Sequence, residues 1–361
     1  MKIISVRLKT NPYNIYIGYN LIKNIHNYLE NLRLGNLGII IASRKVVRIY
    51  NPLIKKNFPK DKYIIIKVAD GEKAKSKTSM FKTIENITKY DGLNKKIFIV
   101  CLGGGTIGDL GGFIASLYKR GIPYVQIPTT LLSQIDSSIG GKTAIDLPDA
   151  KNILGSFYQP RAVFIDPAFL ATLTPQEIKQ GMAEVIKYGI IKDKKFFDYL
   201  MTHYKNILNL KRNEILKVIG TCVKIKADII KKDECEKKGI RTILNFGHTF
   251  GHALESALKY KGITHGEAVS LGMLYAAKLS WLSGRCSIKE VTRISQIIKL
   301  FSLPTEIVFN YRTTCKSLSY DKKFISGRIR MVLLKKIGKV EVAENISLTD
   351  IQRTLKNTLK T

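Results

Sequence analysis

Short runs of apolar and β-branched residues alternate with amphipathic stretches through the first half of the chain. Five of these runs predict strands, at residues 3–8, 37–41, 63–68, 97–102 and 124–127. Between them, residues 80–90 and 110–118 repeat apolar positions every three or four residues, as helices with one covered face do. Alternating strands and helices favour a mostly parallel sheet with helices on both faces.

The pattern changes after the apolar run at 163–166, where strand signals become sparse. Pro175 opens a long helical region, and Thr174 is a suitable cap for its first turn. Helical periodicity continues at 182–188, 196–204, 215–230 and 269–282. Apolar residues at 328–334, followed by a turn at Gly338, predict a late hairpin.

The periodicity therefore predicts a fold of the class α/β plus α. We expect an α/β domain at 1–175 and a mainly helical domain at 176–361, with the boundary near 172–178. The length of 361 residues and the hydrophobic content of 45% are sufficient for two cores. The sequence contains no internal repeat and no low-complexity linker.

Composition narrows the class of protein further. The chain has no run of about 18 apolar residues, so no membrane span is expected. Its first residues, with a lysine at position 2, predict a strand rather than a signal peptide. The five cysteines are odd in number, scattered and never in a CxxC pair. This usage favours reduced thiols in a cytoplasmic protein, without a disulfide framework or a zinc knuckle.

The net charge of +32 raises the possibility of nucleic-acid binding. The lysines are spread along the whole chain, however, and no arm or stripe concentrates them. We therefore expect no specific nucleic-acid partner, although weak, salt-sensitive binding to polyanions is expected. A positive field also attracts an anionic small substrate, so charge alone does not distinguish these functions.

A glycine motif follows the predicted strand at 97–102. Gly103, Gly105 and Gly108 satisfy the GxGxxG pattern between a strand and a helix, the context in which backbone amides cradle a pyrophosphate. The acidic ribose partner expected about 20 residues later is absent. The motif therefore indicates phosphate binding in an atypical manner, and a purely structural turn is the alternative.

Two other turns would lie at the same edge of a parallel sheet. The segment 70–75 follows one predicted strand and the segment 128–130 follows another. Ligands of open α/β sheets bind at the carboxyl ends of the strands. Gly140, Gly141 and Lys142 add a flexible backbone and a positive charge, although an ordinary glycine-rich loop with a solvated lysine has the same pattern.

Three of the five histidines fall between His248 and His265. His248 and His252 are four residues apart, which places them on one face of a helix. Imidazole is a common metal ligand and proton carrier, but an isolated HxxxH pattern is a weak zinc signal. Capping or core histidines remain the alternative on spacing alone.

Glu184 and Lys187 lie three apart on a helical pattern, so they share a face. A surface ion pair is the usual meaning of this spacing, but the apolar neighbours of the pair indicate partial burial. Glu184 with His248 and His265 would form a His₂Glu set with an open coordination position, as in catalytic zinc sites. His252 would then remain for proton transfer.

Taken together, the motifs resemble those of the 3-dehydroquinate synthase family, over nearly the whole chain. The matching segments are 103–109, 120–121, 128–132, 136–142, 151–152, 183–189, 245–252 and 265–267, together with Arg241. The resemblance implies a Rossmann-like first domain and an active site in the cleft between two domains. It also implies a homodimer that acts in the shikimate pathway of chorismate and aromatic amino-acid biosynthesis.

In this family 3-deoxy-D-arabino-heptulosonate 7-phosphate is oxidised by NAD, loses phosphate, is reduced again and closes to 3-dehydroquinate by an aldol step. The resemblance implies that zinc or cobalt is bound by Glu184, His248 and His265. The implied NAD site comprises Asp70, Gly71, Glu72, Lys73, Ala74, Lys75, Gly105, Thr106, Ile107, Gly108, Asp109, Thr129, Thr130, Lys142, Lys151, Phe169, Leu170, Ala171 and Thr172. The implied catalytic and substrate-binding residues are His252, Lys142, Lys187, Arg120, Asn152, Arg241, Asn245, Lys226 and Lys322 or Lys323.

One position departs from the family pattern. After the strand at 37–41 the family usually has Asn or Asp near the adenosine of the cofactor, whereas this chain has Ser43 followed by Arg44. The departure concerns adenosine binding rather than the reaction.

The nearest alternative function is that of a sister sugar-phosphate cyclase, which makes an inosose or a valiolone. Lys151, Asn152, Arg241 and the segment 321–323 favour recognition of a substrate carboxylate and hence the dehydroquinate reaction. A metal-dependent polyol dehydrogenase is a more distant alternative, and it would release NADH stoichiometrically.

Overall fold

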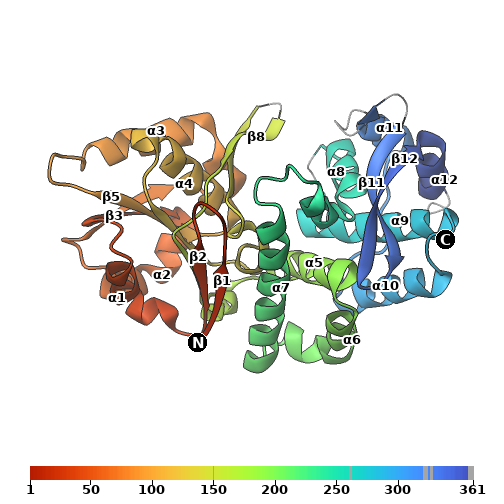
Figure 1. Cartoon of the computed structure of the whole chain (residues 1–361), viewed down its shortest axis with the longest axis horizontal. Coiled ribbons are helices and arrows are strands. Elements are labelled where there is room, and N and C mark those ends of the chain that lie inside the picture. The colour runs from red at the N-terminus through yellow and green to blue at the C-terminus, as the bar shows by residue number, and fades with distance from the viewer. Residues whose placement is uncertain (149, 260–261, 320–323, 326–327, 357–361) are drawn as a thin grey trace. The chain divides into compact units, whose positions relative to one another are not determined.

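The computed structural model describes residues 1–148, 150–259, 262–319, 324–325 and 328–356. It divides into two compact units. The first contains Met1–Leu173 and Ile215–Cys235, and the second contains Thr174–Glu214 and Glu236–Thr361. Figure 1 labels the main elements of both units.

A seven-stranded sheet forms the first unit, in the order β1-β2-β9-β6-β5-β3-β4. The strands are β1 (Lys2–Val6), β2 (Tyr13–Ile17), β9 (Ala162–Ile165), β6 (Tyr124–Pro128), β5 (Ile97–Gly103), β3 (Leu37–Ser43) and β4 (Tyr63–Val68). Only the pair β1–β2 is antiparallel; all other neighbours in this sheet are parallel. The expected mostly parallel sheet is confirmed.

Side chains of β3 point alternately to the two faces of this sheet. Ile39 and Ile41 belong to one core, with residues of α3 (Lys77–Thr88) and α4 (Gly105–Leu117). Ile40 and Ala42 belong to the opposite core, with residues of α1 (Ile25–Asn31) and α2 (Arg44–Asn57). Helices therefore cover both faces of the sheet, α3 and α4 on one and α1 and α2 on the other (Figure 1).

Further short elements complete this unit. They are the 3-10 segments η1 (Leu21–Asn24), η2 (Gly71–Lys75), η3 (Tyr118–Arg120) and η5 (Pro167–Thr172), the π-helical turn η4 (Ser133–Ser137), and a hairpin of β7 (Lys142–Leu147) and β8 (Ala150–Phe157). The glycines before Lys142 have positive φ, as a turn requires, but Lys142 itself already starts a strand. The hairpin was not predicted, because β8 is mostly exposed and lacks an apolar periodicity.

Helix α7 (Arg212–Lys232) follows the expected boundary at 175 and 176 in the sequence, and from Ile215 onward it belongs to the first compact unit. A buried ammonium explains part of this assignment. Lys226 Nζ donates to the backbone oxygen of Asp136 at 2.6 Å and to its carboxylate at 2.7 Å. A helix can thus follow the boundary in sequence and still contribute to the preceding core.

The second unit is mainly helical, as expected. Its elements are α5 (Pro175–Lys192), α6 (Lys194–Leu208), η6 (Ile240–Asn245), α8 (His248–Ala257), α9 (His265–Leu282), α10 (Ile288–Leu300), α11 (Tyr311–Ser319), β10 (Phe324–Ile325), β11 (Arg328–Lys336), β12 (Lys339–Ser347) and α12 (Leu348–Lys356). Thr174 caps α5 in a reciprocal capping box with Glu177. The predicted hairpin is formed by β11 and β12. Within the described residues, no helix has both the length and the hydropathy needed to cross a membrane.

Candidate active site

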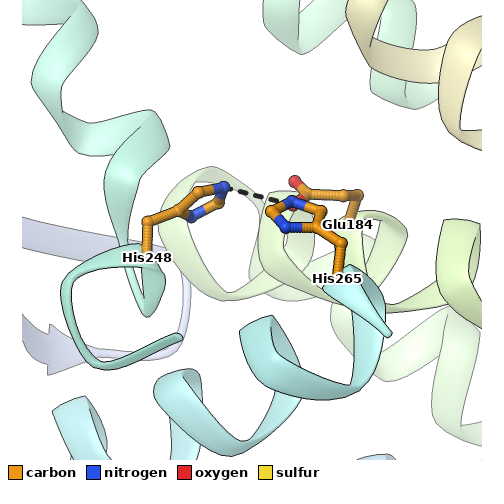
Figure 2. A group of neighbouring side chains, drawn as sticks. All are labelled: Glu184, His248 and His265. Carbon is orange, nitrogen blue, oxygen red and sulfur yellow. Dashed lines mark ion pairs between the residues drawn. The ribbon is translucent and has the colours of Figure 1, made fainter. Parts of the chain in front are cut away.

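Three side chains that lie far apart in the sequence converge in the second unit. Glu184 comes from the middle of α5, whereas His248 and His265 are the first residues of α8 and α9. Figure 2 shows the two imidazoles and the carboxylate grouped between these helices. Their potential ligand atoms all lie within 4.8 Å of one another.

The distances within this group suit a metal ion. Ligands about 2.1 Å from a tetrahedral zinc lie about 3.4 Å apart. Oε1 of Glu184 is 3.4 Å from Nε2 of His248 and 3.9 Å from Nε2 of His265. The three donors therefore require only small side-chain adjustments to bind one ion.

The side chain of Glu184 is buried at 2% exposure. Neither of its oxygens accepts a well-formed hydrogen bond, although the ammonium of Lys187 pairs with Oε2. Burial raises the pKa of this carboxyl, but the charges of Lys187 and His248 more than offset burial and keep the pKa well below its ordinary value. This carboxylate is buried, ionised and without a well-formed hydrogen bond, and a bound divalent cation would neutralise its charge.

The two histidines of this group, His248 and His265, have different surroundings. Burial and the nearby Lys187 charge lower the pKa of His248, which favours the neutral imidazole that a metal requires. Burial also acts to lower the pKa of His265, but Glu255 and Glu184 outweigh it, so that pKa is raised. Both rings stand at helix N-termini, where the positive end of the dipole disfavours imidazolium.

Glu255 was not among the predicted site residues. Its Oε1 lies 3.4 Å from Nδ1 of His265, and His252, Glu255 and His265 form a second group with converging ligand atoms. His252 is exposed and is not a member of the set with Glu184. The spacing of three residues between His252 and Glu255 on α8 is the signal that could have identified this carboxylate.

Close contact between helix backbones holds Glu184, His248 and His265 in place. A Cβ on Gly266, the residue after His265, would lie 2.5 Å from Cα of Gln180 in α5. A Cβ on Gly272 in α9 would lie 2.0 Å from the carbonyl oxygen of Gly247, which precedes α8. Only glycine permits such approaches, so α5 and α8 both pack directly against α9.

Other candidates for substrate binding lie in the same unit. Lys187 and Arg241 are each 2% exposed, and Asn245, at the end of η6, is half-buried. Buried cations are suited to a phosphate or a carboxylate. Lys322 and Lys323 lie outside the described residues.

In the first unit, the glycine motif lies at the carboxyl end of β5, as predicted. Gly104 is the N-cap of α4, and the backbone oxygen of Gly103 accepts a hydrogen bond of 2.9 Å from Thr129 N–H. A Cβ on Gly108 would lie 2.6 Å from Oε1 of Gln126 in β6. This glycine thus has a packing role, and the free N-terminus of α4 still offers amides to a phosphate.

Three predicted residues meet beside this loop. Lys75, which is 3% exposed, donates to the carboxylate of Asp109 at 2.8 Å and to the side-chain oxygen of Asn152. Burial acts to lower the pKa of Lys75, but Asp109 outweighs it and raises that pKa. Asp146, which was not predicted, lies 3.9 Å from the same ammonium and accepts the Asn152 backbone N–H at 2.7 Å. The segments 70–75, 105–109 and 151–152 are therefore brought together.

The remaining predicted residues are more dispersed. The segment at Phe169–Thr172 contacts Tyr50, whose hydroxyl donates to the Phe169 carbonyl at 3.1 Å. Lys142 is exposed, with its ammonium 6.0 Å from the centre of the Phe157 ring. Lys226 is engaged by Asp136. Arg120 is exposed and lies just before β6. It therefore lies near the amino ends of the parallel strands, whereas the glycine loop lies at their carboxyl ends.

Comparison with known proteins covers most of the chain. Residues 45–180 match the family model described as 3-dehydroquinate synthase N-terminal, and residues 181–324 match the one described as 3-dehydroquinate synthase C-terminal. The 3-dehydroquinate synthase of Desulforamulus reducens is 40% identical, with 98% of this chain and 99% of the relative covered. That of Dictyoglomus thermophilum is 41% identical, with 99% and 98% covered.

Solved structures of related cyclases have the same fold. A 2-epi-5-epi-valiolone synthase from Streptomyces hygroscopicus subsp. jinggangensis, with NAD⁺ and Zn²⁺ bound, gives a TM-score of 0.87 at 26% identity, with 98% of both chains covered. A 2-deoxy-scyllo-inosose synthase, complexed with carbaglucose-6-phosphate, NAD⁺ and Co²⁺, gives 0.87 at 25% identity, with 99% of this chain and 100% of that one covered.

Proposed function

Because this chain belongs to the 3-dehydroquinate synthase family, we propose that it converts 3-deoxy-D-arabino-heptulosonate 7-phosphate to 3-dehydroquinate and phosphate. The observation that carries the proposal is the convergence of His248 and His265 on the buried carboxylate of Glu184. Such a donor set suits a catalytic divalent metal with an open position. The reaction belongs to the phosphate-eliminating cyclases, a class of carbon–oxygen lyase.

The cofactors are NAD and a divalent metal, zinc or cobalt. When bound, they supply a hydride acceptor and a Lewis acid for the substrate hydroxyl and carbonyl groups. Glu184, His248 and His265 hold the metal. The glycine loop and the amides at the start of α4 hold the dinucleotide phosphates.

The protein's own residues then bind and orient the substrate. Lys187 and Arg241 are buried cations that suit its phosphate and carboxylate, and Asn245 suits a hydroxyl. We call Glu184, His248 and His265 the metal set. His252 is exposed and close to this set, with its ring centre 5.5 Å from that of His248. We assign it proton transfer during ring opening and closure, with the substrate phosphate as a second base.

The nucleotide residues belong to the first unit and the metal residues to the second. Hydride transfer needs the nicotinamide in contact with the carbon that is oxidised. We therefore propose that residues of both units take part in the same turnover. The expected homodimer and the cytoplasmic location, which the five free cysteines support, are part of the same proposal.

The proposal is tested with purified protein, NAD, Zn²⁺ and the heptulosonate phosphate. We expect phosphate and dehydroquinate in equal amounts, with no net absorbance change at 340 nm, because the hydride is returned in each cycle. A hexose phosphate and a heptulose phosphate, the substrate classes of the sister cyclases, should release no phosphate. Stoichiometric NADH would instead support a dehydrogenase, and no phosphate release by metal-loaded protein would reject the proposed reaction.

The ligand assignment has a separate test. His265→Ala removes a half-exposed ligand, and we expect the variant to remain folded but to lose zinc on dialysis and to lose activity. His203→Ala on α6 is the matched control, because His203 is also half-buried but stacks on Tyr199, away from the metal set. Normal zinc content in His265→Ala would contradict the assignment.

A further inference from the structure

The hairpin of β7 and β8 contains a bulge beside Asp146. The ladder changes register on either side of this residue, so three residues of β8, at 151–153, stand opposite Asp146 alone. Asn152 is the middle residue of the three, and its φ of 54° lies in the left-handed region that residues other than glycine rarely adopt. Bulges turn a side chain in a new direction and are frequent beside functional sites. The bulge therefore determines the direction of the Asn152 side chain.

The carboxylate of Asp146 supports the backbone of this bulge. Its Oδ1 accepts the backbone N–H of Asn152, which is not paired in the ladder, at 2.7 Å. The backbone of Asp146 in turn pairs with that of Ser76, the N-cap of α3, and the Asp146 side chain is only 14% exposed. Asp146 is therefore a fixed acceptor for Asn152 rather than a solvated surface group.

The ammonium of Lys75 fixes the side chain of the same asparagine. An ammonium has donors only, so the atom of Asn152 that faces Lys75 is the amide oxygen. Lys75 is 3% exposed, and it is also held by Asp109 at 2.8 Å and by Asp146 at 3.9 Å. Asn152 is exposed, and among the described residues the structure gives its side-chain NH₂ group no acceptor. Asn152 thus presents two N–H donors, while its acceptor oxygen is engaged.

The stability of the hairpin does not require this arrangement. Glycine adopts the left-handed conformation without strain, so the bulge itself needs no asparagine at position 152. Burial of the Lys75 ammonium carries a desolvation cost, which a turn of the chain alone would not justify. Lys75 and Asp109 also follow β4 and β5, at the carboxyl ends where parallel sheets bind their ligands. These observations favour a role in ligand binding.

We propose that Asp146 is a positioning residue for the reaction, which holds the bulge of β8 so that the NH₂ group of Asn152 donates to an anionic oxygen of the substrate. The inference rests on the proposed function, because the substrate is the heptulosonate phosphate assigned there. An amide N–H binds such an oxygen without transferring a proton, so Asn152 orients the substrate and takes no part in acid–base steps. Lys75 joins this residue to Asp109 beside the glycine loop.

The first test measures substrate binding without turnover. The zinc-loaded chain is saturated with NADH, which cannot accept a hydride, and the heptulosonate phosphate is titrated into it by calorimetry. We expect Asp146→Ala to weaken substrate binding at least about tenfold, the scale of one charge-assisted hydrogen bond, and to change NADH affinity less than about threefold. Asp146→Asn keeps an acceptor for the Asn152 N–H, so it should bind the substrate within about threefold of the wild type. Glu85→Ala, which removes an exposed carboxylate of α3, is the control and should change neither affinity.

A double-mutant cycle separates positioning from a general structural effect. Asn152→Gly removes the amide and keeps a residue that adopts the left-handed conformation. If Asp146 acts through Asn152, Asp146→Ala should weaken substrate binding by less than about twofold when it is added to Asn152→Gly. Independent losses in the two single variants would overturn the inference. Normal substrate binding by Asp146→Ala would also overturn it, as would an equal loss of NADH affinity.

Phosphate release by the wild type with NAD tests the reaction separately. If the cycle behaves as expected but no phosphate is released, the proposed reaction fails and the positioning role stands. If phosphate is released but the losses at Asp146 and Asn152 are independent, the reaction stands and the positioning role fails. A wild-type chain that does not bind the heptulosonate phosphate would reject both.

Discussion

Glu255 has the geometry of a residue that orients a metal ligand. Its carboxylate faces Nδ1 of His265, while Nε2 of the same ring faces Glu184. Carboxylates in this position fix the tautomer and the direction of a ligating imidazole, and their loss usually weakens metal binding about 10–100-fold. We assign Glu255 as a positioning residue for His265.

We therefore predict that Glu255→Gln lowers zinc affinity by about 10–100-fold, as measured by competition with a chelator. Glu255→Asp should restore part of the affinity, because it keeps the charge. Glu344→Gln, at an exposed site on β12, is the control and should bind zinc normally. Equal zinc affinity in Glu255→Gln and the wild type, with both folded, would remove this role from Glu255.

Single residues also show how much of the candidate site could be predicted from the sequence. The spacing of Glu184 and Lys187 is compatible with a surface pair or a buried one, and only packing decides; each side chain is 2% exposed. His248, His252 and His265 could be recognised as a group because histidine is scarce in this chain. The spacing of Glu255 from His252 places the two residues on one face of α8, but the contact of Glu255 with His265 depends on where α9 begins relative to α8.

At the scale of elements, the metal set depends on the contact between α5 and α9. Gly266 allows this contact, since any Cβ there would collide with the backbone of Gln180. We predict that Gly266→Ala lowers the free energy of unfolding by about 1–3 kcal/mol, as overpacking does. Zinc affinity should fall as well, because His265 moves with α9 away from Glu184.

Chemical denaturation and chelator competition measure the two effects. Gly92→Ala is the control, because no atom lies within 4 Å of the position of its Cβ. A fully stable Gly266→Ala with normal zinc affinity would mean that the two helices can separate without disturbing the ligands.

The helix caps offer a second test at this scale. Thr174 and Thr264 cap α5 and α9 in the same way, each within a capping box. Thr→Ala at either cap should lower the free energy of unfolding by about 1 kcal/mol. Only Thr264→Ala should also weaken zinc binding, because His265 is the first residue of α9 whereas Glu184 lies in the interior of α5. Equal zinc binding by the two variants would argue against a link between the α9 cap and the ligand.

Among the elements, strong periodicity determined what could be predicted. The parallel strands β3, β5 and β6 are buried and β4 is partly buried, all four are rich in apolar residues, and their positions were predicted to within two residues. The exposed strand β8 has no such pattern, and its place depends on pairing with β7. The assignment of α7 to the first unit depends on tertiary contacts such as the one between Lys226 and Asp136, which no local pattern encodes.

At the scale of the whole molecule, the net charge of +32 is the dominant property. A field of this size attracts a substrate that carries both a phosphate and a carboxylate, and it does so over distances that salt screens. The same field does not hold the substrate in the site that we propose, because the buried residues Lys187 and Arg241 are protected from screening. Ionic strength should therefore act on substrate capture more than on the chemical steps.

We predict that kcat/KM falls by about tenfold or more between about 0.02 and 0.2 M NaCl, whereas kcat changes by less than about twofold, because screening weakens long-range attraction. Steady-state kinetics with saturating NAD and zinc measures both constants. Sucrose at matched viscosities is the control for diffusion, since it slows encounter without screening charge.

If kcat/KM is independent of salt, capture of the substrate does not depend on the field, and the excess of lysine has no part in binding the substrate. If kcat falls in parallel, salt is reaching the buried cations, and the protection expected for Lys187 and Arg241 is absent.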